Sequence, residues 1–262
     1  MRKRGRALQL DCDTSVADLY KSASQRARVI SEAWFRSFGY CLSCDSNRLV
    51  QTAANTRARD FLCPDCSQAY ELKASAGKLG RTLPDGAYSA LISRVQDGQA
   101  PTLMLLERSS LWAVKSLTAI HGQFLTPEVI VKRKPLSPDA RRAGWIGCSI
   151  RLDLMAPDAQ IPVVSDGKCL EPAKVRQTFQ RFNKLGALNV GMRGWVLLTL
   201  RVIRSLGVSN FSLDAIYGQE AKFAAVYPMN RNIRAKIRQQ LQVLRDLGYV
   251  EFRGNGRYRF LI

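Results

Sequence analysis

Two cysteine pairs of the form Cys-x-x-Cys strongly constrain how this 262-residue chain can fold. The first pair is Cys41 and Cys44, the second is Cys63 and Cys66, and 18 residues separate the pairs. Each pair can supply two thiolates to one side of a tetrahedral Zn²⁺ ion, and this spacing is typical of zinc ribbons. The alternative is two unrelated pairs or redox motifs. We therefore expect 41–66 to fold around a structural zinc ion, because four protein ligands leave no coordination position open for catalysis.

The net charge of the chain indicates which class of molecule it binds. A formal net charge of +19 favours polyanions, with DNA or RNA ahead of an anionic membrane. No apolar run reaches the roughly 18 residues of a membrane span, and none near the start suits a signal peptide, so we expect a cytoplasmic protein outside the membrane. The single histidine, His121, disfavours Ser-His-Asp hydrolysis and histidine-metal nucleases. Hydrolytic chemistry would therefore rest on carboxylates, lysine and a metal.

A pattern typical of metal-dependent nucleases surrounds the second cysteine pair. We expect residues 68–73 to form a strand, so that Glu71 and Lys73 point to the same face. Asp60 precedes the cysteine pair, and a turn at this pair can bring Asp60 and Glu71 to one Mg²⁺ ion. Such an ion activates water and neutralises phosphate charge, while Lys73 stabilises developing negative charge. Taken alone the pattern is weak, because it also recurs by chance on solvated strands.

Helical and strand patterns alternate over the first part of the chain. Apolar residues recur at helical spacing over 22–38 and 85–96, whereas 103–106 and 161–164 are apolar runs of the kind that form buried strands. Such alternation predicts an α/β core. The periodicity weakens after about residue 183, and dense helical patterns follow. The expected domains are 1–185, with the zinc-binding insertion at 41–66, and 186–262.

The last part of the chain has the pattern of a winged helix. We expect helices over 193–206, 212–226 and 230–247, followed by a hairpin of 250–253 and 257–260. The third helix has an apolar face and a basic face, and the hairpin separates aromatic from basic residues in the same way. The alternative is a solvated cationic helix in an ordinary bundle. The residues expected to contact DNA here are Arg231, Arg234, Arg238, Gln242, Arg253, Arg257 and Arg259.

A basic segment interrupted by prolines, 132–147, carries a tryptophan between glycines. Arg141 and Arg142 precede this tryptophan and can contact DNA phosphates. Trp145 itself can contact a base or an apolar mark on a base. It can equally be a core residue, and the sequence does not separate these two roles.

Longer runs of sequence resemble the family of DpnI-like methyl-directed restriction endonucleases, over nearly the whole chain. The segments that carry the resemblance are Ser24-Gln25-Arg26-Ala27-Arg28-Val29, Asp60-Phe61 with Cys63 and Cys66, Tyr70-Glu71-Leu72-Lys73, Asp85-Gly86-Ala87-Tyr88, Gln123-Phe124 with Thr126-Pro127, Arg141-Arg142-Ala143-Gly144-Trp145-Ile146-Gly147-Cys148 and Lys236-Ile237-Arg238-Gln239-Gln240-Leu241-Gln242-Val243-Leu244-Arg245-Asp246. The resemblance implies a restriction-endonuclease-like α/β core of the PD-(D/E)xK type with an embedded four-cysteine zinc site. It also implies an α+β winged-helix domain after that core.

The resemblance also implies an activity and a role for each site residue. The activity is Mg²⁺-dependent cleavage of both strands of DNA at sites containing N6-methyladenine, within methylated GATC, by a monomer in bacterial restriction. Asp60, Glu71 and Lys73 are then catalytic, with Asp60 and Glu71 as magnesium ligands. Cys41, Cys44, Cys63 and Cys66 are the zinc ligands, and Trp145 is the methyl sensor of the nuclease domain. Arg59 stands where the wider superfamily often has the proline of the PD-(D/E)xK motif. That proline does not bind the metal ion, so its replacement removes no metal ligand.

Two other classes of function remain open from the sequence. The main alternative is a non-catalytic DNA-binding regulator with a structural zinc ion and a winged helix. The intact pair of Glu71 and Lys73 argues against that alternative. An RNA-binding zinc-ribbon protein is the third class, which tighter binding to structured RNA than to duplex DNA would favour.

Overall fold

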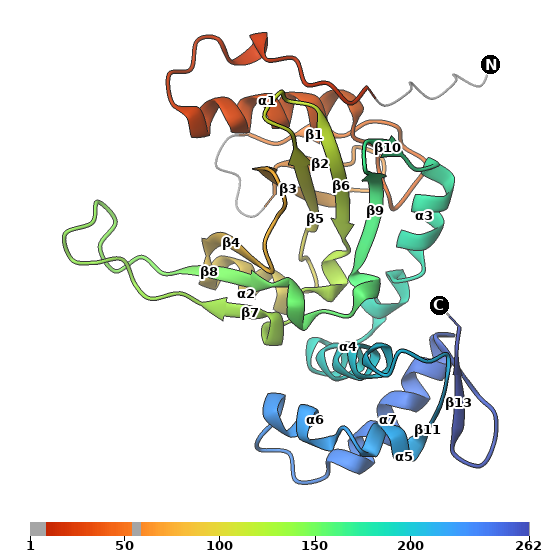
Figure 1. Ribbon diagram of the computed structural model, residues 1–262. Helices are drawn as coiled ribbons and strands as arrows, with labels where there is room; N and C mark the ends of the chain where they lie inside the picture. The colour runs from red at the N-terminus through yellow and green to blue at the C-terminus, as the bar shows by residue number, and fades with distance from the viewer. Residues whose placement is uncertain (1–8, 54–58, 262) are drawn as a thin grey trace.

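A mixed β-sheet forms the centre of the computed structural model, which describes residues 9–53 and 59–261. The seven strands have the order β1-β2-β3-β5-β6-β9-β10 (Figure 1). β3 pairs with β5 in parallel, and every other pair in this sheet is antiparallel. The expected α/β core is therefore confirmed. The strands are β1 Val50–Gln51, β2 Phe61–Leu62, β3 Ala69–Ala76, β5 Thr102–Arg108, β6 Val114–Ile120, β9 Gln160–Ser165 and β10 Lys168–Cys169.

Helix α1, Ala23–Phe38, confirms the helix expected over 22–38. Ser22 has extended backbone before the first turn, and the helix buries Ile30, Trp34 and Phe35 against the sheet. The ring of Phe35 packs edge-on against Phe61 of β2, with ring centres 4.9 Å apart. The helix ends at Gly39, where a β-carbon would collide with the carbonyl oxygen of Phe35. This packing also brings the side of α1 that carries Glu32 next to Gln51 of β1.

A second sheet of three strands, β4 Thr82–Ala87, β8 Gly147–Arg151 and β7 Ile130–Lys132, lies beside the first in the order β4-β8-β7. Residues 133–146 join β7 to β8 and project from the body on the side opposite to helix α3, Pro172–Gln180 (Figure 1). We call residues 132–147 the arm.

The helix expected over 85–96 begins later than predicted. Helix α2 spans Tyr88–Gln96, whereas Asp85 and Ala87 pair with Cys148 and Gly147 in the ladder between β4 and β8. Backbone pairing with a strand distant in sequence therefore outweighs the local helical periodicity. This correction matters because it moves Asp85 from a helix to a strand end.

The C-terminal part contains four helices and a small sheet. The helices are α4 Val190–Ser205, α5 Leu213–Tyr217, α6 Glu220–Val226 and α7 Ile233–Asp246. The strands β11 Asn210–Ser212, β12 Val250–Phe252 and β13 Arg257–Phe260 have the order β11-β13-β12.

Two details of this winged helix were not predicted. The single helix expected over 212–226 is broken into two. The last helical hydrogen bond of α5 runs from Gly218 N to Asp214 O, and the next residue, Gln219, has non-helical backbone angles. Strand β11 was also missed, since its only pairing is with β13 and this partner lies more than 40 residues later.

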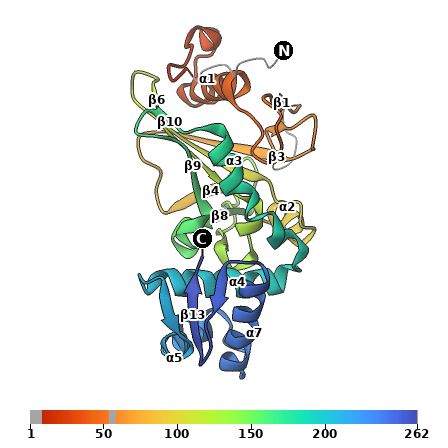
Figure 2. The same cartoon turned by 90° about the vertical axis from the view of Figure 1, so that its right-hand side faces the viewer.

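Helix α4 lies between the mixed sheet and the rest of the C-terminal part (Figure 2). Arg204 on this helix pairs with the buried carboxylate of Asp158. Further bonds across the same junction are Arg201 Nη1 to Leu154 O at 2.9 Å, Tyr227 Oη to Glu128 Oε1 at 2.9 Å and Tyr249 Oη to Arg181 O at 2.8 Å. Within residues 9–53 and 59–261, none of the helices has the length and apolar character needed to cross a membrane.

Candidate functional site

The four cysteines predicted to bind zinc meet in one cluster. Their Sγ atoms all lie within 4.8 Å of one another, with 3.5 Å between Cys41 and Cys66 and 3.6 Å between Cys44 and Cys63. Sulfur atoms at the corners of a tetrahedral Zn²⁺ site lie about 3.8 Å apart, given zinc–sulfur bonds of about 2.3 Å. The cluster therefore fits a structural zinc ion.

The backbone at the second cysteine pair favours a thiolate at Cys63. Burial acts to raise the pKa of Cys63, but N–H groups of Cys66 and Asp65 outweigh it and lower the pKa to about 7. Ser67 adopts a positive φ of 60°, and its N–H returns to the carbonyl of Cys63 to close the turn. Thiolates are the form that zinc binds.

Tyr70 of β3 and Arg176 of α3 attach the cysteine cluster to the core. The fully buried Tyr70 accepts a hydrogen bond from Leu42 N at 2.8 Å, and its hydroxyl lies 3.2 Å from Cys41 Sγ. Arg176 donates from Nε to the carbonyl of Cys41 at 2.9 Å. The cluster is therefore bound to the strand that carries Glu71 and Lys73.

The three residues predicted to be catalytic are close together. Lys73 Nζ lies 2.6 Å from Glu71 Oε1, and both side chains are on the same face of β3. Asp60 precedes β2, and its Oδ2 accepts a hydrogen bond from Leu72 N at 2.8 Å. The antiparallel pairing of β2 with β3 thus brings Asp60 next to Glu71, as the turn at the second cysteine pair led us to expect.

A fourth residue in this cluster was not predicted. Asp85 of β4 accepts from Lys73 Nζ at 2.6 Å, and its side chain is only 6% exposed. Its sequence signal was present in the segment Asp85-Gly86-Ala87-Tyr88, but without the pairing of β4 this residue was assigned to a helix. Lys73 is therefore held between two carboxylates from different strands.

Burial sets the protonation of this cluster. It raises the pKa of Glu71 to about 7, although Lys73 opposes the shift. Burial also raises the pKa of Asp60, against the opposing effect of the Leu72 N–H. For Lys73 burial acts to lower the pKa, but Glu71 and Asp85 outweigh it, so that the pKa rises and the ammonium is maintained.

The oxygen atoms of the cluster suit a divalent cation. Glu71 Oε2 and Asp85 Oδ2 are buried, and neither has a hydrogen-bond partner within the part of the chain that the structure describes. Buried acceptors without a donor are costly, and a bound cation would compensate this cost. Carboxylate oxygens are also the ligands that Mg²⁺ prefers. The residues that can hold such an ion are Asp60 and Glu71, with Asp85 beside them.

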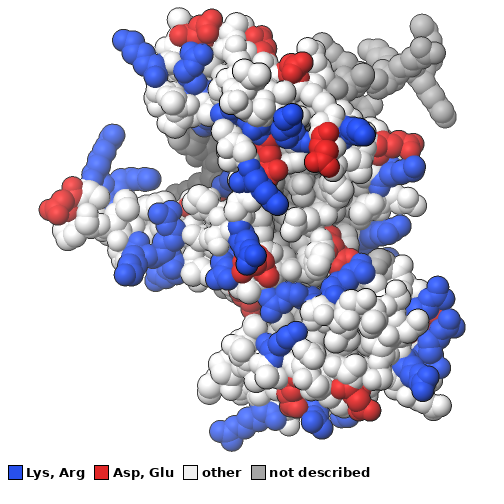
Figure 3. All heavy atoms as spheres, viewed as in Figure 1, with Lys and Arg blue, Asp and Glu red and all other residues white. Residues whose placement is uncertain are grey.

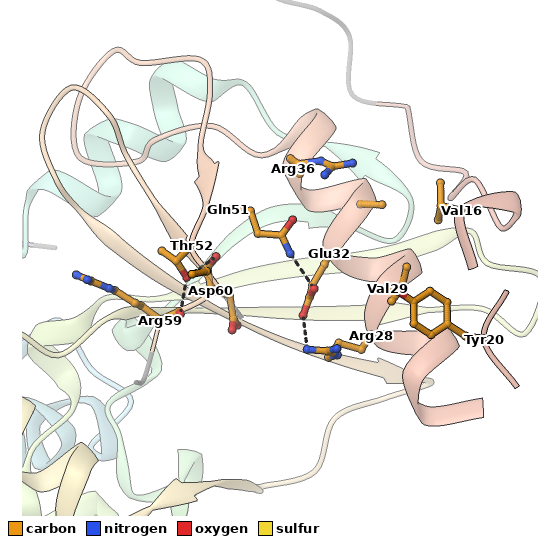
Figure 4. Close-up of a pocket in the computed structure, with 12 residues that line it drawn as sticks. Val16, Tyr20, Arg28, Val29, Glu32, Arg36, Gln51, Thr52, Arg59 and Asp60 are labelled. Atoms are coloured by element: carbon orange, nitrogen blue, oxygen red, sulfur yellow. Dashed lines mark hydrogen bonds and ion pairs between the residues drawn. The ribbon is translucent and has the colours of Figure 1, made fainter. Parts of the chain in front are cut away.

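Helix α1 lines a pocket of about 510 Å³ next to Asp60 (Figure 4). Glu32 on this helix accepts a hydrogen bond from Gln51 Nε2 at 2.9 Å and lies 3.8 Å from Arg28 Nη1. Burial raises the pKa of Glu32, although Arg28 opposes the shift. Arg28 lies in one of the segments that carry the family resemblance, but Arg28, Glu32 and Gln51 were not predicted as site residues, because their role depends on how α1 packs.

The arm presents cations around a partly exposed tryptophan. Arg141 and Arg142 are exposed, and the guanidinium of Arg142 lies 4.5 Å from the ring centre of Trp145. The same ring packs against Gly147, where a β-carbon would come within 2.9 Å of it. Trp145 is half-buried at the base of the arm and is not part of the hydrophobic core. Lysine and arginine side chains gather along the arm (Figure 3).

The DNA-contact residues expected in the winged helix are exposed. On α7, Ile233, Ile237, Leu241 and Leu244 form the buried face, as their spacing predicted. Two arginines are anchored to neighbouring helices, Arg234 to Glu220 at 2.9 Å and Arg238 to Tyr217 Oη at 3.1 Å. The exposed residues are Arg231 just before α7, Arg234, Arg238 and Gln242 on α7, and Arg253, Arg257 and Arg259 on the wing.

Comparison with family models gives two matches. Residues 8–187 match the model of the Dam-replacing family. Residues 191–260 match the model of the Dam-replacing helix-turn-helix domain. The first match contains the cysteine cluster, Asp60, Glu71, Lys73, Asp85 and the arm, and the second contains α7 and the wing.

Proposed function

Because the chain belongs to the Dam-replacing family of DpnI-like endonucleases, we propose that it is a Mg²⁺-dependent type II restriction endonuclease for DNA carrying N6-methyladenine. Its substrate is double-stranded DNA, cleaved within methylated GATC sites. Family membership implies a methyl-dependent restriction endonuclease with a DNA-binding helix-turn-helix domain. The observation that carries the finer proposal is the cluster of Asp60, Glu71 and Lys73 with Asp85.

We assign residues 1–185 to the nuclease domain and 186–262 to the winged-helix domain. In this division α4 belongs to the DNA-reading part, although it packs against the nuclease core. The proposed working form is a monomer. It carries one structural Zn²⁺ ion on Cys41, Cys44, Cys63 and Cys66.

The four side chains of this cluster would have different roles in phosphodiester hydrolysis. Asp60 and Glu71 would hold the Mg²⁺ ion, which when bound lowers the pKa of an attacking water and neutralises phosphate charge. Lys73 is too basic to accept a proton near neutral pH, so it acts as a cation. Two of its three ammonium donors bind Glu71 and Asp85, and the third can stabilise charge on the scissile phosphate.

The methyl group is a small recognition signal. It adds an apolar group in the major groove and removes one donor hydrogen from adenine. Burying one methyl group contributes about 1 kcal/mol, or roughly fivefold in affinity. Reading the mark in both domains would multiply this preference. We assign the contact in the nuclease domain to the partly exposed ring of Trp145.

Digestion of a mapped plasmid tests the proposed function. Methylated plasmid should be cut at GATC sites with Mg²⁺, whereas unmethylated plasmid and reactions with EDTA should remain intact. Asp60→Ala and Lys73→Ala should abolish cleavage and leave DNA binding largely unchanged. Binding of methylated DNA without cleavage under any metal condition would instead establish a non-catalytic regulator.

Trp145→Ala tests the assignment of the methyl sensor. Its preference for methylated over unmethylated duplex should fall roughly fivefold, in proportion to one lost methyl contact. Arg141→Ala is the matched control, because it removes an exposed neighbouring cation, keeps the contact of Arg142 with Trp145, and should weaken binding to both duplexes alike. An unchanged preference in Trp145→Ala would assign the methyl contact elsewhere.

A further inference from the structure

Arg28 of α1 lies at the junction of two pockets that reach the catalytic cluster. It lines the pocket that contains Asp60, and it also lines a pocket of about 380 Å³ that contains Lys73. Its side chain is 61% exposed, so the guanidinium is available to a ligand. The charge of Arg28 also acts on Asp60, where it lowers the carboxyl pKa against the effect of burial. A ligand that bridges the two pockets would therefore contact Arg28.

Two further residues restrict the position of this guanidinium. Glu32 follows Arg28 by one helical turn, and its side chain is only 17% exposed. Gln51 of β1 donates a hydrogen bond to Glu32 Oε2, which leaves Oε1 directed toward Arg28 (Figure 4). Gln51 belongs to the sheet next to Asp60. The contacts from Gln51 to Glu32 and from Glu32 to Arg28 therefore fix the position of the guanidinium relative to the strands of the catalytic cluster.

The chemistry of the pocket suits a phosphodiester. Arg36 and Arg59 line it together with Arg28, so three arginines and two carboxylates, Glu32 and Asp60, contribute to its walls. A cation on Asp60 would increase the positive charge further. Phosphate oxygens are the DNA groups that arginine binds most directly, through two parallel hydrogen bonds. The planar fork of Arg28 needs a fixed orientation for this contact, which Glu32 provides.

We propose that Arg28 binds a backbone phosphate of the cleaved strand beside the scissile bond, and that Glu32, anchored by Gln51, positions Arg28 for this contact. The inference rests on the proposed nuclease function. It makes α1 a wall of the DNA site, in addition to the arm.

A phosphate-by-phosphate comparison of wild type and Arg28→Ala tests the contact. Methylated duplexes are prepared with one neutral methylphosphonate at each position flanking the scissile bond, and single-turnover cleavage is measured. One position should slow the wild type by about 10- to 100-fold, the effect of a lost charged hydrogen bond. Arg28→Ala should cleave the unmodified duplex more slowly than the wild type by a similar factor. A methylphosphonate at that position should not slow this variant further. Equal sensitivity of both proteins at every position would overturn the proposal.

The controls separate this proposal from the proposed function. Lys174→Ala removes an exposed cation on α3 and should cleave like the wild type. Thermal unfolding and zinc content of Arg28→Ala should match the wild type, so that misfolding is not the cause of its loss. If the wild type does not cleave methylated DNA, the proposed function fails. If it cleaves and Arg28→Ala cleaves within twofold of it, only the present inference fails.

Glu32→Ala tests the positioning role. It should slow cleavage less than Arg28→Ala, and the double variant should be no slower than Arg28→Ala, because Glu32 acts through Arg28. An additive loss in the double variant would show an independent role of Glu32 and overturn the positioning part.

Discussion

At the scale of single residues, the protonation of Glu71 would control cation binding in the proposed catalytic cluster. Its carboxyl is buried beside Asp60 and Asp85, which also carry negative charge, and its pKa rises to about 7. Below this pH the Glu71 carboxyl is protonated and neutral, so it is a poor ligand for a metal ion. Lys73 stays charged on both sides of this transition.

Cleavage at limiting Mg²⁺ should therefore fall as the pH is lowered through about 7. The sign follows from competition, since a proton and a cation bind the same carboxylate and acid favours the proton. Raising the Mg²⁺ concentration should move the midpoint to lower pH. Single-turnover rates between pH 5.5 and 8.5 at two Mg²⁺ concentrations measure this, and a flat profile at both concentrations would contradict it.

Asp85→Asn should change both the rate and its pH dependence. The charge of Asp85 contributes to the raised pKa of Glu71, so its removal should shift the midpoint of the profile to lower pH. The maximal rate should fall by about tenfold or more, because Lys73 loses one of two charged partners that orient it. Asp97→Asn is the control, an exposed carboxylate that lines the same pocket as Asp85 and should change neither quantity.

The sequence predicted part of this cluster for a physical reason. Glu71 and Lys73 share a face because side chains alternate along any strand, and a turn at the second cysteine pair places Asp60 near them. Asp85 and Arg28 were beyond such reasoning, because they reach the cluster only through the pairing of β4 with β8 and the packing of α1. Those contacts depend on residues distant in sequence.

At the scale of elements, strand β3 contributes alternate residues to the cysteine cluster and to the proposed catalytic cluster. Tyr70 points toward the cysteine cluster, whereas Glu71 and Lys73 point toward the catalytic cluster. The burial of Tyr70 raises its pKa, so the hydroxyl keeps its proton and can donate to the thiolate of Cys41. Donors of this kind orient metal ligands and slow metal release.

Tyr70→Phe should release zinc faster than the wild type. The variant loses the contact to Cys41 and leaves Leu42 N without its acceptor, and such partners typically contribute 10- to 100-fold to metal affinity. Zinc transfer to a chromophoric chelator measures the rate. Tyr40→Phe is a matched control, since the buried Tyr40 hydroxyl has no hydrogen-bond partner in the described chain and its loss should leave the rate unchanged.

Local sequence was a good guide to long amphipathic elements and a poor guide to short ones. The helices α1 and α7 and the strands β5 and β9 follow their apolar spacing closely. Strand β11 has three residues, and its existence depends on backbone bonds to β13. The break between α5 and α6 likewise has no strong signal, because Gly218 is tolerated within helices at a modest cost.

At the scale of the whole molecule, polar contacts connect the two parts of the chain. The carboxylate of Asp158 is 7% exposed and receives two donors from Arg204, one of them Nε at 2.8 Å. Tyr227 and Glu128 form a second bond across the same junction. The net charge of +19 predicted a polyanionic partner, but not how the two DNA-binding parts are arranged.

Asp158→Ala should destabilise this junction. Removing one member of a partly buried ion pair should cost about 1 to 3 kcal/mol, less than for a fully buried pair because Arg204 is 31% exposed. Thermal unfolding should begin at lower temperature, and proteases should cut faster between residues 181 and 190. Asp153→Ala, which breaks a more exposed pair with Arg151, is the control. Equal stability of both variants would show that the pair of Arg204 and Asp158 does not stabilise the junction.

The turn that contains Cys63 and Cys66 lies between Asp60 and Glu71 in the chain, and this has a consequence for biogenesis. The two carboxylates become neighbours only when β2 and β3 have paired across that turn. The same hairpin thus holds the second cysteine pair and joins the two carboxylates, so we expect zinc binding at the turn to favour the arrangement of both sites. Under the proposed function, a newly synthesised chain would therefore become active on DNA only as it acquired zinc.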